Sequence, residues 1–190
     1  MKMIFASNNK NKIQELRAHG LEFVGLKDAG LNVDPPETGD TFEANALQKA
    51  SYVEILRPDA WILAEDSGVC VDALGGAPGV YSKRFSPEQT DYANNLLLLH
   101  KLYGEANRQI EMVSCFVLLR PGLAPLWSRH AVSGTVSENM RGTSGFGYDP
   151  IFVPDGEKLT LAELPPDKRS VMYPRLHALE GILRMLDRHL

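Results

Sequence analysis

The alternation of apolar and polar positions at the start of the chain predicts a strand, a helix and a second strand. Residues 3–6 form a short apolar run typical of a buried strand, and residues 7–9 are polar residues common at a helix start. A helix is predicted from there until Gly20, and residues 21–26 predict the next strand. This order favours an α/β sheet fold and makes the loop after the first strand the first place to look for a site.

Helical spacing of apolar residues returns between residues 41 and 57, where Phe42, Ala46, Ala50 and Val53 share one face. Residues 61–64 then predict a strand that ends at the polar run 65–68. The glycine- and proline-rich stretch 75–79 predicts a loop, because glycine reaches positive φ and proline fixes its own.

The second half of the chain changes from helical to β-rich patterning. A long helix is predicted over 87–103, followed by β-rich segments at 110–119 and 126–136 that Pro121-Gly122 separates, as expected for antiparallel strands. A glycine-rich loop at 142–149 precedes a short apolar run. A last helix is predicted with an apolar face made of Leu176, Leu179, Ile182, Leu183 and Leu186. No repeat or linker divides the chain, so residues 1–190 are interpreted as one domain.

Composition narrows the class of protein. With 44% hydrophobic and 23% charged residues the chain is typical of a globular protein, and its net charge of −4 argues against a nucleic-acid partner. Cys70 and Cys115 lie in apolar runs without metal-ligand spacing, which predicts buried reduced thiols. No apolar stretch approaches the roughly 20 residues that span a bilayer, and the first residues lack the apolar core of a signal peptide. We therefore expect a cytoplasmic protein with no membrane partner.

Polar residues after the first predicted strand suggest an anion site. The run Ser7-Asn8-Asn9-Lys10-Asn11-Lys12 stands at a strand-to-helix junction, where free backbone N–H groups and the helix dipole favour an anion. The side chain of Lys12 adds a full positive charge. The alternative is an ordinary solvated helix start, which the composition of the run favours when it is taken alone.

Acidic residues suggest a metal site. Glu65 and Asp66 follow an apolar strand, and carboxylate oxygens suit a hard cation such as Mg²⁺; Glu37 in the loop after Pro36 would complete the set. Lys49 shares a helix face with Asn45 and would meet a charged site. The alternatives are a turn with solvated acids and a solvated lysine.

Glycines flank an aromatic residue in the segment Gly145-Phe146-Gly147-Tyr148-Asp149-Pro150. Such a segment lets the ring of Phe146 lie against a nucleotide base, while Asp149 would accept hydrogen bonds from a purine edge. A tight turn with a core aromatic residue is the competing interpretation.

In their order and in their residues, these segments resemble the inosine triphosphate pyrophosphatase family, the Ham1-like non-canonical purine nucleotide pyrophosphatases. The resemblance extends from Met3 to about Leu186 and also includes residues 72–82. It implies a curved mixed β-sheet with flanking helices that forms two lobes around a central substrate cleft, dependence on Mg²⁺, and usually a homodimer.

The resemblance also implies roles for individual residues. Residues 7–12 and Lys49 would hold the triphosphate of a purine nucleotide. Glu37 and Asp66 would bind metal, with Asp66 as the favoured general base and Glu65 as the alternative. The base would contact residues of the later segments, and the substrate-binding set is completed by Ser67, Phe146, Gly147, Tyr148, Asp149, Arg169 and Arg175.

The chain departs from the family pattern before its last helix. Relatives usually carry a lysine and then Ser-His-Arg, which helps to recognise the base; here the stretch 169–175 reads Arg-Ser-Val-Met-Tyr-Pro-Arg. Arg175 is retained, Arg169 or its neighbour Lys168 replaces the lysine, and Tyr173-Pro174 stand where the family has Ser-His.

The resulting hypothesis is an Mg²⁺-dependent hydrolase that converts the triphosphates of inosine, deoxyinosine and xanthosine to monophosphate and pyrophosphate. A water activated by Asp66 or Glu65 would attack the α phosphorus. Two alternatives are kept: a related pyrophosphatase with another base preference, motivated by Tyr173-Pro174, and a nucleotide-binding protein without turnover.

Overall fold

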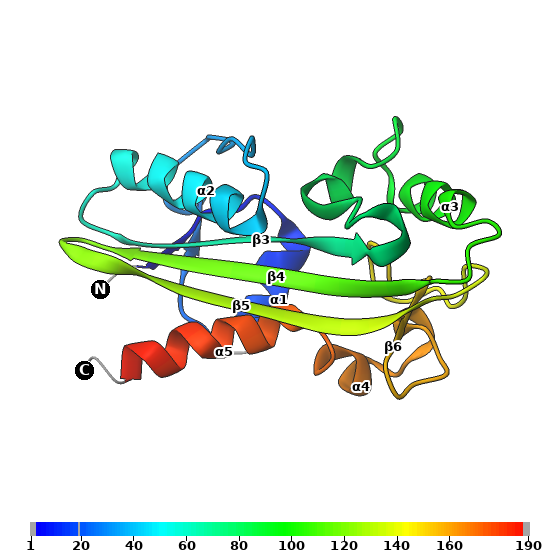
Figure 1. Ribbon diagram of the computed structural model, residues 1–190. Coiled ribbons are helices and arrows are strands. Elements are labelled where there is room, and N and C mark those ends of the chain that lie inside the picture. The colour runs from blue at the N-terminus through cyan, green and yellow to red at the C-terminus, as the bar shows by residue number, and fades with distance from the viewer. Residues whose placement is uncertain (1–2, 19, 188–190) are drawn as a thin grey trace. The chain divides into compact units, whose positions relative to one another are not determined.

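The computed structural model describes residues 3–18 and 20–187. A sheet in the order β2-β1-β3-β4-β5-β6 is combined with helices, so the fold is α/β with a mixed sheet (Figure 1). The elements are β1 (Met3–Phe5), α1 (Lys10–Ala18), β2 (Val24–Gly25), α2 (Phe42–Leu56), β3 (Trp61–Val71), α3 (Asp91–Lys101), β4 (Gln109–Arg120), β5 (Leu123–Val136), β6 (Phe152–Pro154), α4 (Pro166–Ser170) and α5 (Pro174–Asp187), with short 3₁₀ turns at Asp72–Leu74, Gly79–Arg84 and Leu161–Glu163.

The chain divides into two compact units. Of the described residues, unit 1 contains 3–18, 20–66, 115–129 and 176–187, and unit 2 contains 67–114 and 130–175. Strands β3, β4 and β5 each contribute residues to both. No described helix is long and apolar enough to cross a membrane.

Unit 1 has a core on each face of its sheet. Strand β1 pairs in parallel with β2 and β3. Helix α2 packs Ala46, Ala50 and Val53 with Ile62 and Ala64 of β3. On the other face, α1 and α5 pack with Phe5 and Leu63, as Figure 1 shows for α2 and α5 on opposite sides of the strands. Alternate residues of β3 therefore serve opposite cores, as the two-residue period of a strand requires.

Unit 2 has a single apolar cluster. It joins Val69 and Val71 of β3 to Leu98 of α3 and Phe152 of β6, and it also contains Tyr148 and Tyr173. Strand β6 pairs with β5 antiparallel, and the two-residue connection between β4 and β5 makes that pair antiparallel as well.

Most predicted elements are present, with four differences. The strand predicted over 21–26 is reduced to Val24–Gly25. The helix predicted over 87–103 begins only at Asp91, because the Thr90 side chain caps it by accepting a hydrogen bond from the N–H of Ala93. The short helix α4 was not predicted at all. The fourth difference concerns the acidic residues.

The prediction that β3 ends before the acidic run was wrong. Strand β3 continues through Glu65, Asp66, Ser67 and Gly68 to Val71, and both acidic side chains are buried. Each acid meets a lysine, so the strand can continue through charged positions without an unpaired buried charge. Gly68 is required here, since a Cβ would overlap Ser82 and the carbonyl of Gly79.

Candidate active site

The predicted anion loop lies at the start of α1, and two of its side chains accept hydrogen bonds from the loop's own backbone. The side chain of Asn9 accepts from the backbone N–H groups of Asn11 at 3.0 Å and Lys12 at 3.3 Å, and Ser7 Oγ accepts from the N–H of Asn9 at 3.2 Å. Asn9 therefore acts as a helix N-cap. Asn8, Lys10 and Asn11 are exposed, and Asn8 donates to the carbonyl of Val33.

Lys12 turns toward the sheet and forms an ion pair with Glu65. Its Nζ lies 2.6 Å from Glu65 Oε2, and the Glu65 side chain is fully buried. Because a buried carboxylate requires a partner, this pair fixes the position of the Lys12 ammonium on the α1 face of β3.

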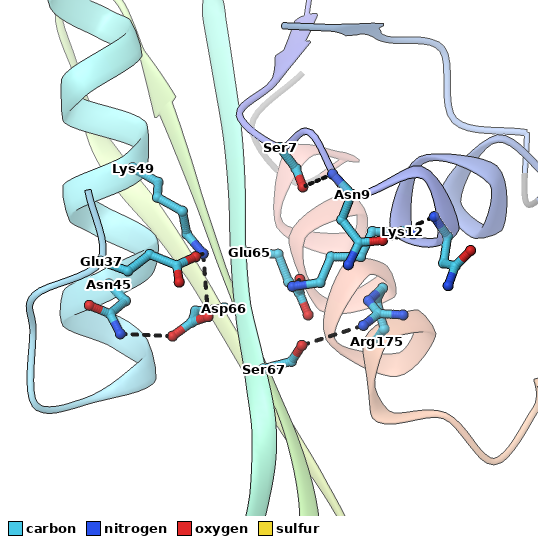
Figure 2. A network of polar contacts seen from close by, with 11 residues as sticks. Ser7, Asn9, Lys12, Glu37, Asn45, Lys49, Glu65, Asp66, Ser67 and Arg175 are labelled. Carbon is cyan, nitrogen blue, oxygen red and sulfur yellow. Dashed lines mark hydrogen bonds and ion pairs between the residues drawn. The ribbon is translucent and has the colours of Figure 1, made fainter. Parts of the chain in front are cut away.

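A second charged group lies on the α2 face of β3. Lys49 Nζ is 2.6 Å from Glu37 Oε1 and 3.3 Å from Asp66 Oδ1, and Asn45 Nδ2 donates to Asp66 Oδ2 at 3.0 Å (Figure 2). Asn45, Lys49 and Asp66 are all buried. The alternative interpretation of Lys49 as a solvated lysine is therefore wrong.

Burial and charge act against each other in this group. Burial alone would lower the pKa of Lys49, but the carboxylates of Asp66 and Glu37 outweigh it, so the pKa lies above its ordinary value and the ammonium is retained. Burial raises the pKa of Asp66, and the opposing effects of Lys49, Lys12 and Asn45 do not cancel it. A carboxylate whose pKa is raised in this way is a better proton acceptor near neutral pH.

The interpretation of Glu65 and Asp66 as two carboxylates of one site was wrong. Consecutive residues of a strand point to opposite faces, and Figure 2 shows Glu65 directed to the side of Lys12 and Asp66 to the side of Lys49. The carboxylate that joins Asp66 is instead Glu37, which a loop brings to the same ammonium.

Asn45 holds that loop, a role that the sequence analysis did not assign. Its Oδ1 accepts from the backbone N–H of Gly39 at 2.7 Å while its amide donates to Asp66. Gln48 accepts from the N–H of Thr38 at 2.8 Å and so secures the neighbouring residue. The available signal was an asparagine on the apolar, buried face of α2.

Unit 2 contains the aromatic segment and the residues that surround it. The rings of Phe146 and Tyr173 stack with centroids 5.5 Å apart and an interplanar angle of 28°. The guanidinium of Arg175 lies 5.8 Å from the centroid of the Phe146 ring, and its Nη2 is 3.4 Å from Ser67 Oγ. Phe146, Tyr173, Arg175 and Ser67, which are far apart in sequence, are thus joined in one unit.

Two residues of α3 hold Gly147 by both of its backbone polar groups. The N–H donates to Asp91 Oδ2 and the carbonyl accepts from Asn95 Nδ2, each at 2.7 Å. Neither residue was assigned a role from the sequence, although an asparagine directly before the apolar run 96–99 was a usable signal.

Three predicted substrate contacts are engaged within the protein. Tyr148 lies in the apolar cluster and its hydroxyl donates to the carbonyl of Ser82 at 2.7 Å. Arg169 lies on α4, 3.4 Å from the carbonyl of Leu164, and Lys168 forms an ion pair with Glu157 at 2.7 Å. Nothing in these contacts favours a substrate role for the three.

The Glu37–Asp66 pair fits a divalent cation of the Mg²⁺ type. Both carboxylates converge on one cationic group, the Lys49 ammonium, and supply the oxygen atoms that Mg²⁺ prefers. Within residues 3–18 and 20–187 no group of three or more His, Cys, Asp or Glu side chains is placed to hold a metal. Two carboxylates without a full cage are the arrangement in which Mg²⁺ takes its remaining ligands from water and phosphates.

Comparison with known proteins places this arrangement in context. Residues 3–185 match the Ham1 family. The chain is 44% identical over 187 residues to a dITP/XTP pyrophosphatase of Exiguobacterium sp., covering 96% of this chain and 95% of the relative. It is 39% identical over 184 residues to a protein of the same name from Deinococcus radiodurans, covering 96% and 91%.

Two solved structures are similar to this chain over all or nearly all of its length. The Ham1 protein of Staphylococcus aureus superposes with a TM-score of 0.91 at 30% identity, covering all of both chains. A nucleoside-triphosphatase / dITP/XTP pyrophosphatase of Mycobacterium abscessus gives a TM-score of 0.82 at 38% identity, covering 96% of this chain and 99% of the other.

Proposed function

Because the chain belongs to the Ham1 family, we propose that it hydrolyses the triphosphates of non-canonical purines, namely inosine, deoxyinosine and xanthosine, to monophosphate and pyrophosphate. The observation that carries the proposal is the group in which the buried Asn45, Lys49 and Asp66 meet the half-buried Glu37. Burying charged side chains costs free energy. Two carboxylates held against a lysine provide metal ligands and a positive charge, which metal-assisted phosphate chemistry uses.

Glu37 and Asp66 are the residues that would hold Mg²⁺. The ion, when bound, supplies neutralisation of phosphate charge. When Glu37 and Asp66 bind the ion, Lys49 would leave them and contact a phosphate oxygen. Its ammonium is a compact charge on a flexible side chain, which allows this change of partner. Lys12 offers a second positive charge from the other face of β3.

Asp66 is the proposed general base. It takes a proton from water as the water oxygen bonds to the α phosphorus, and the bond from that phosphorus to the oxygen bridging to the β phosphorus breaks, so pyrophosphate leaves. Its raised pKa suits proton acceptance, and Asn45 Nδ2 fixes the orientation of its carboxylate. Glu65 is assigned the positioning of Lys12 and not proton transfer, because it is fully buried against that lysine.

Phe146 and Arg175 are the proposed base contacts. A purine would stack on the Phe146 ring, and the guanidinium beside it only donates hydrogen bonds. The 6-oxo group of hypoxanthine or xanthine accepts such a bond, whereas the 6-amino group of adenine would leave the donor unpaired. Guanine shares the 6-oxo group, so Arg175 does not separate it from inosine. A homodimer, usual in the family, completes the proposal.

The test is pyrophosphate release by the purified protein with Mg²⁺ from a panel of inosine, xanthosine, adenosine, guanosine and pyrimidine triphosphates in ribo and deoxy forms. We expect at least tenfold higher kcat/KM for the first two than for adenosine triphosphate. Equal rates on pyrimidines would favour the related pyrophosphatase with another base preference, for which Tyr173 is the motivating residue. Binding without any release would favour the nucleotide-binding protein.

A further inference from the structure

Asp149 is placed to hold other residues of its own unit. Asp149 is only 1% exposed. Its Oδ2 accepts hydrogen bonds from the backbone N–H of Phe146, at 3.0 Å, and from the Tyr173 hydroxyl. An oxygen of this kind has two lone pairs, and the two donors use both. The Oδ2 atom therefore connects Phe146 to Tyr173 through one buried carboxylate.

Tyr173 contacts the same aromatic residue a second time. Its ring stacks on the Phe146 ring, and the residue is only 7% exposed. Phe146 is thus held at its backbone by Asp149 and at its ring by Tyr173, and the two holding residues are bonded to each other. Gly145 makes the approach of the carboxylate possible, because a Cβ at this residue would overlap Asp149 Oδ2.

We propose that Tyr173 and Asp149 are positioning residues that fix Phe146 as a stacking platform, and that Asp149 acts on the base only through Phe146. This inference rests on the proposed function, since it assumes that Phe146 stacks on the base. It replaces the expectation that Asp149 reads a purine edge directly, which its burial and its bonds to Phe146 and Tyr173 argue against.

The two assignments predict different kinetics. Every base has a π face, so stacking on a platform is tolerant of base identity, and loosening the platform weakens all nucleotides by a similar factor. A carboxylate that accepted a bond from a base N–H would instead discriminate among bases, because only some bases offer a donor at that position.

The experiment compares Tyr173→Phe and Asp149→Asn with the wild-type protein on inosine, adenosine and cytidine triphosphates. Tyr173→Phe keeps the ring and removes only the hydroxyl. We expect a KM increase of roughly tenfold for each nucleotide with kcat within about twofold, as the loss of one hydrogen bond to a charged group predicts. The ratio of kcat/KM between inosine and adenosine triphosphate is expected to stay within about threefold of the wild-type ratio.

Three measurements separate positioning from general damage. Inhibition by tripolyphosphate, which has no base, is expected to be unchanged in both variants. Tyr103→Phe, at a tyrosine of the same unit that is 91% exposed, serves as the matched control and should behave as wild type. The double variant should weaken binding by less than the sum of the two single changes, because Tyr173 and Asp149 act through the hydrogen bond that they share.

The inference is overturned by any of four results: a changed ratio among bases in Asp149→Asn, an unchanged KM in both variants, an equal loss of tripolyphosphate affinity, or additive effects in the double variant. Calorimetric binding of inosine, adenosine and cytidine monophosphates provides the same comparison without turnover. If the wild-type protein hydrolyses no nucleotide, the proposed function fails, and uniform weakening of these monophosphates in Tyr173→Phe still decides the role of Tyr173.

Discussion

The two units of this chain hold their functional side chains by different physical means. In unit 1, Lys12, Lys49, Glu65 and Asp66 form ion pairs between buried or nearly buried groups. In unit 2, Phe146 is held by stacking on Tyr173 and by one hydrogen bond from its N–H to Asp149, and Gly147 by two side chains of α3. The buried lysine–carboxylate pairs of the candidate site thus lie in unit 1, and its aromatic stack lies in unit 2.

The contrast between the units shows how a small acidic protein can act on a polyanion. A net charge of −4 provides no broad attraction for phosphates, so positive charge has to be local and precisely placed. The buried Lys49 and the partly buried Lys12, each paired with a carboxylate, provide such placement. Base recognition requires little charge, and a rigid aromatic platform with one guanidinium is enough. We expect unit 1 to determine turnover and unit 2 to determine affinity for the base.

The largest effect is expected from Asp66→Asn. General acid–base catalysis contributes about 10²–10⁴-fold, so kcat should fall by at least about 100-fold with KM little changed. Steady-state pyrophosphate release is the measurement. A variant that retained more than about a tenth of the wild-type turnover would contradict the assignment of Asp66 as base.

The same variant also tests the cost of the buried charge. The pKa of Asp66 is higher in the folded than in the unfolded state, so its contribution to stability is lost as pH rises through the folded pKa. At pH 7–8 without Mg²⁺, Asp66→Asn should therefore unfold at a temperature equal to or above that of the wild type. A clear fall in Tm would show that the pair with Lys49 stabilises more than burial costs.

Phe146→Leu should have the next largest effect, and of the opposite kind. Stacking of a base on an aromatic ring contributes roughly 1–3 kcal/mol, so KM should rise at least fivefold for every nucleotide while kcat changes little. Measuring kcat and kcat/KM for both Phe146→Leu and Asp66→Asn tests whether unit 1 determines turnover and unit 2 determines affinity for the base. A fall in kcat of the same size as the rise in KM would break it.

Glu65→Gln should act mainly on stability and only modestly on turnover. Removing one partner of a buried pair costs about 3–5 kcal/mol, somewhat less here because Lys12 is 15% exposed, so Tm should fall by several degrees. Lys12→Met combined with Glu65→Gln should recover most of that loss. If Glu65→Gln lowered kcat as much as Asp66→Asn, Glu65 would have to be a base after all.

The smallest effect is expected at Cys115, which no proposed step uses. Burial raises the pKa of its thiol to about 12, with the charge of Glu43 adding to the shift. Thiolate is therefore rare at pH 8, of the order of one molecule in 10⁴, whereas an unfolded thiol has a pKa near 8.5. Mass spectrometry after iodoacetamide treatment should find Cys115 unmodified in the native protein and modified in denaturant. Rapid native labelling would contradict its burial.

Sequence patterns predicted the regular elements well and the site only in part. Periodicity was sufficient for α2, whose apolar stripe 42, 46, 50 and 53 is buried, and for α5. It failed at β3, because polar residues normally end a buried strand and only tertiary pairing with Lys12 and Lys49 allows this one to continue. The opposite directions of Glu65 and Asp66 follow from that continuation.

The contacts that join distant segments were beyond the reach of a single sequence. Nothing near Asn45 in sequence indicates that it bonds both Gly39 and Asp66, and Tyr173 is separated from Asp149 by 24 positions. Residue type indicated the chemistry of Phe146, and the family resemblance indicated that of Arg175, but neither indicated that Arg175 lies over the Phe146 ring. Long-range hydrogen bonds depend on the packing of whole elements, which local propensity does not encode.

Hydrolysis of inosine triphosphate in ¹⁸O-labelled water, followed by ³¹P NMR of both products, identifies the phosphorus atom that water attacks. If Asp66 directs water to the α phosphorus, the label is found in inosine monophosphate and the pyrophosphate is unlabelled. Label in pyrophosphate, or release of inosine diphosphate and orthophosphate, would show attack at another phosphorus and contradict the account.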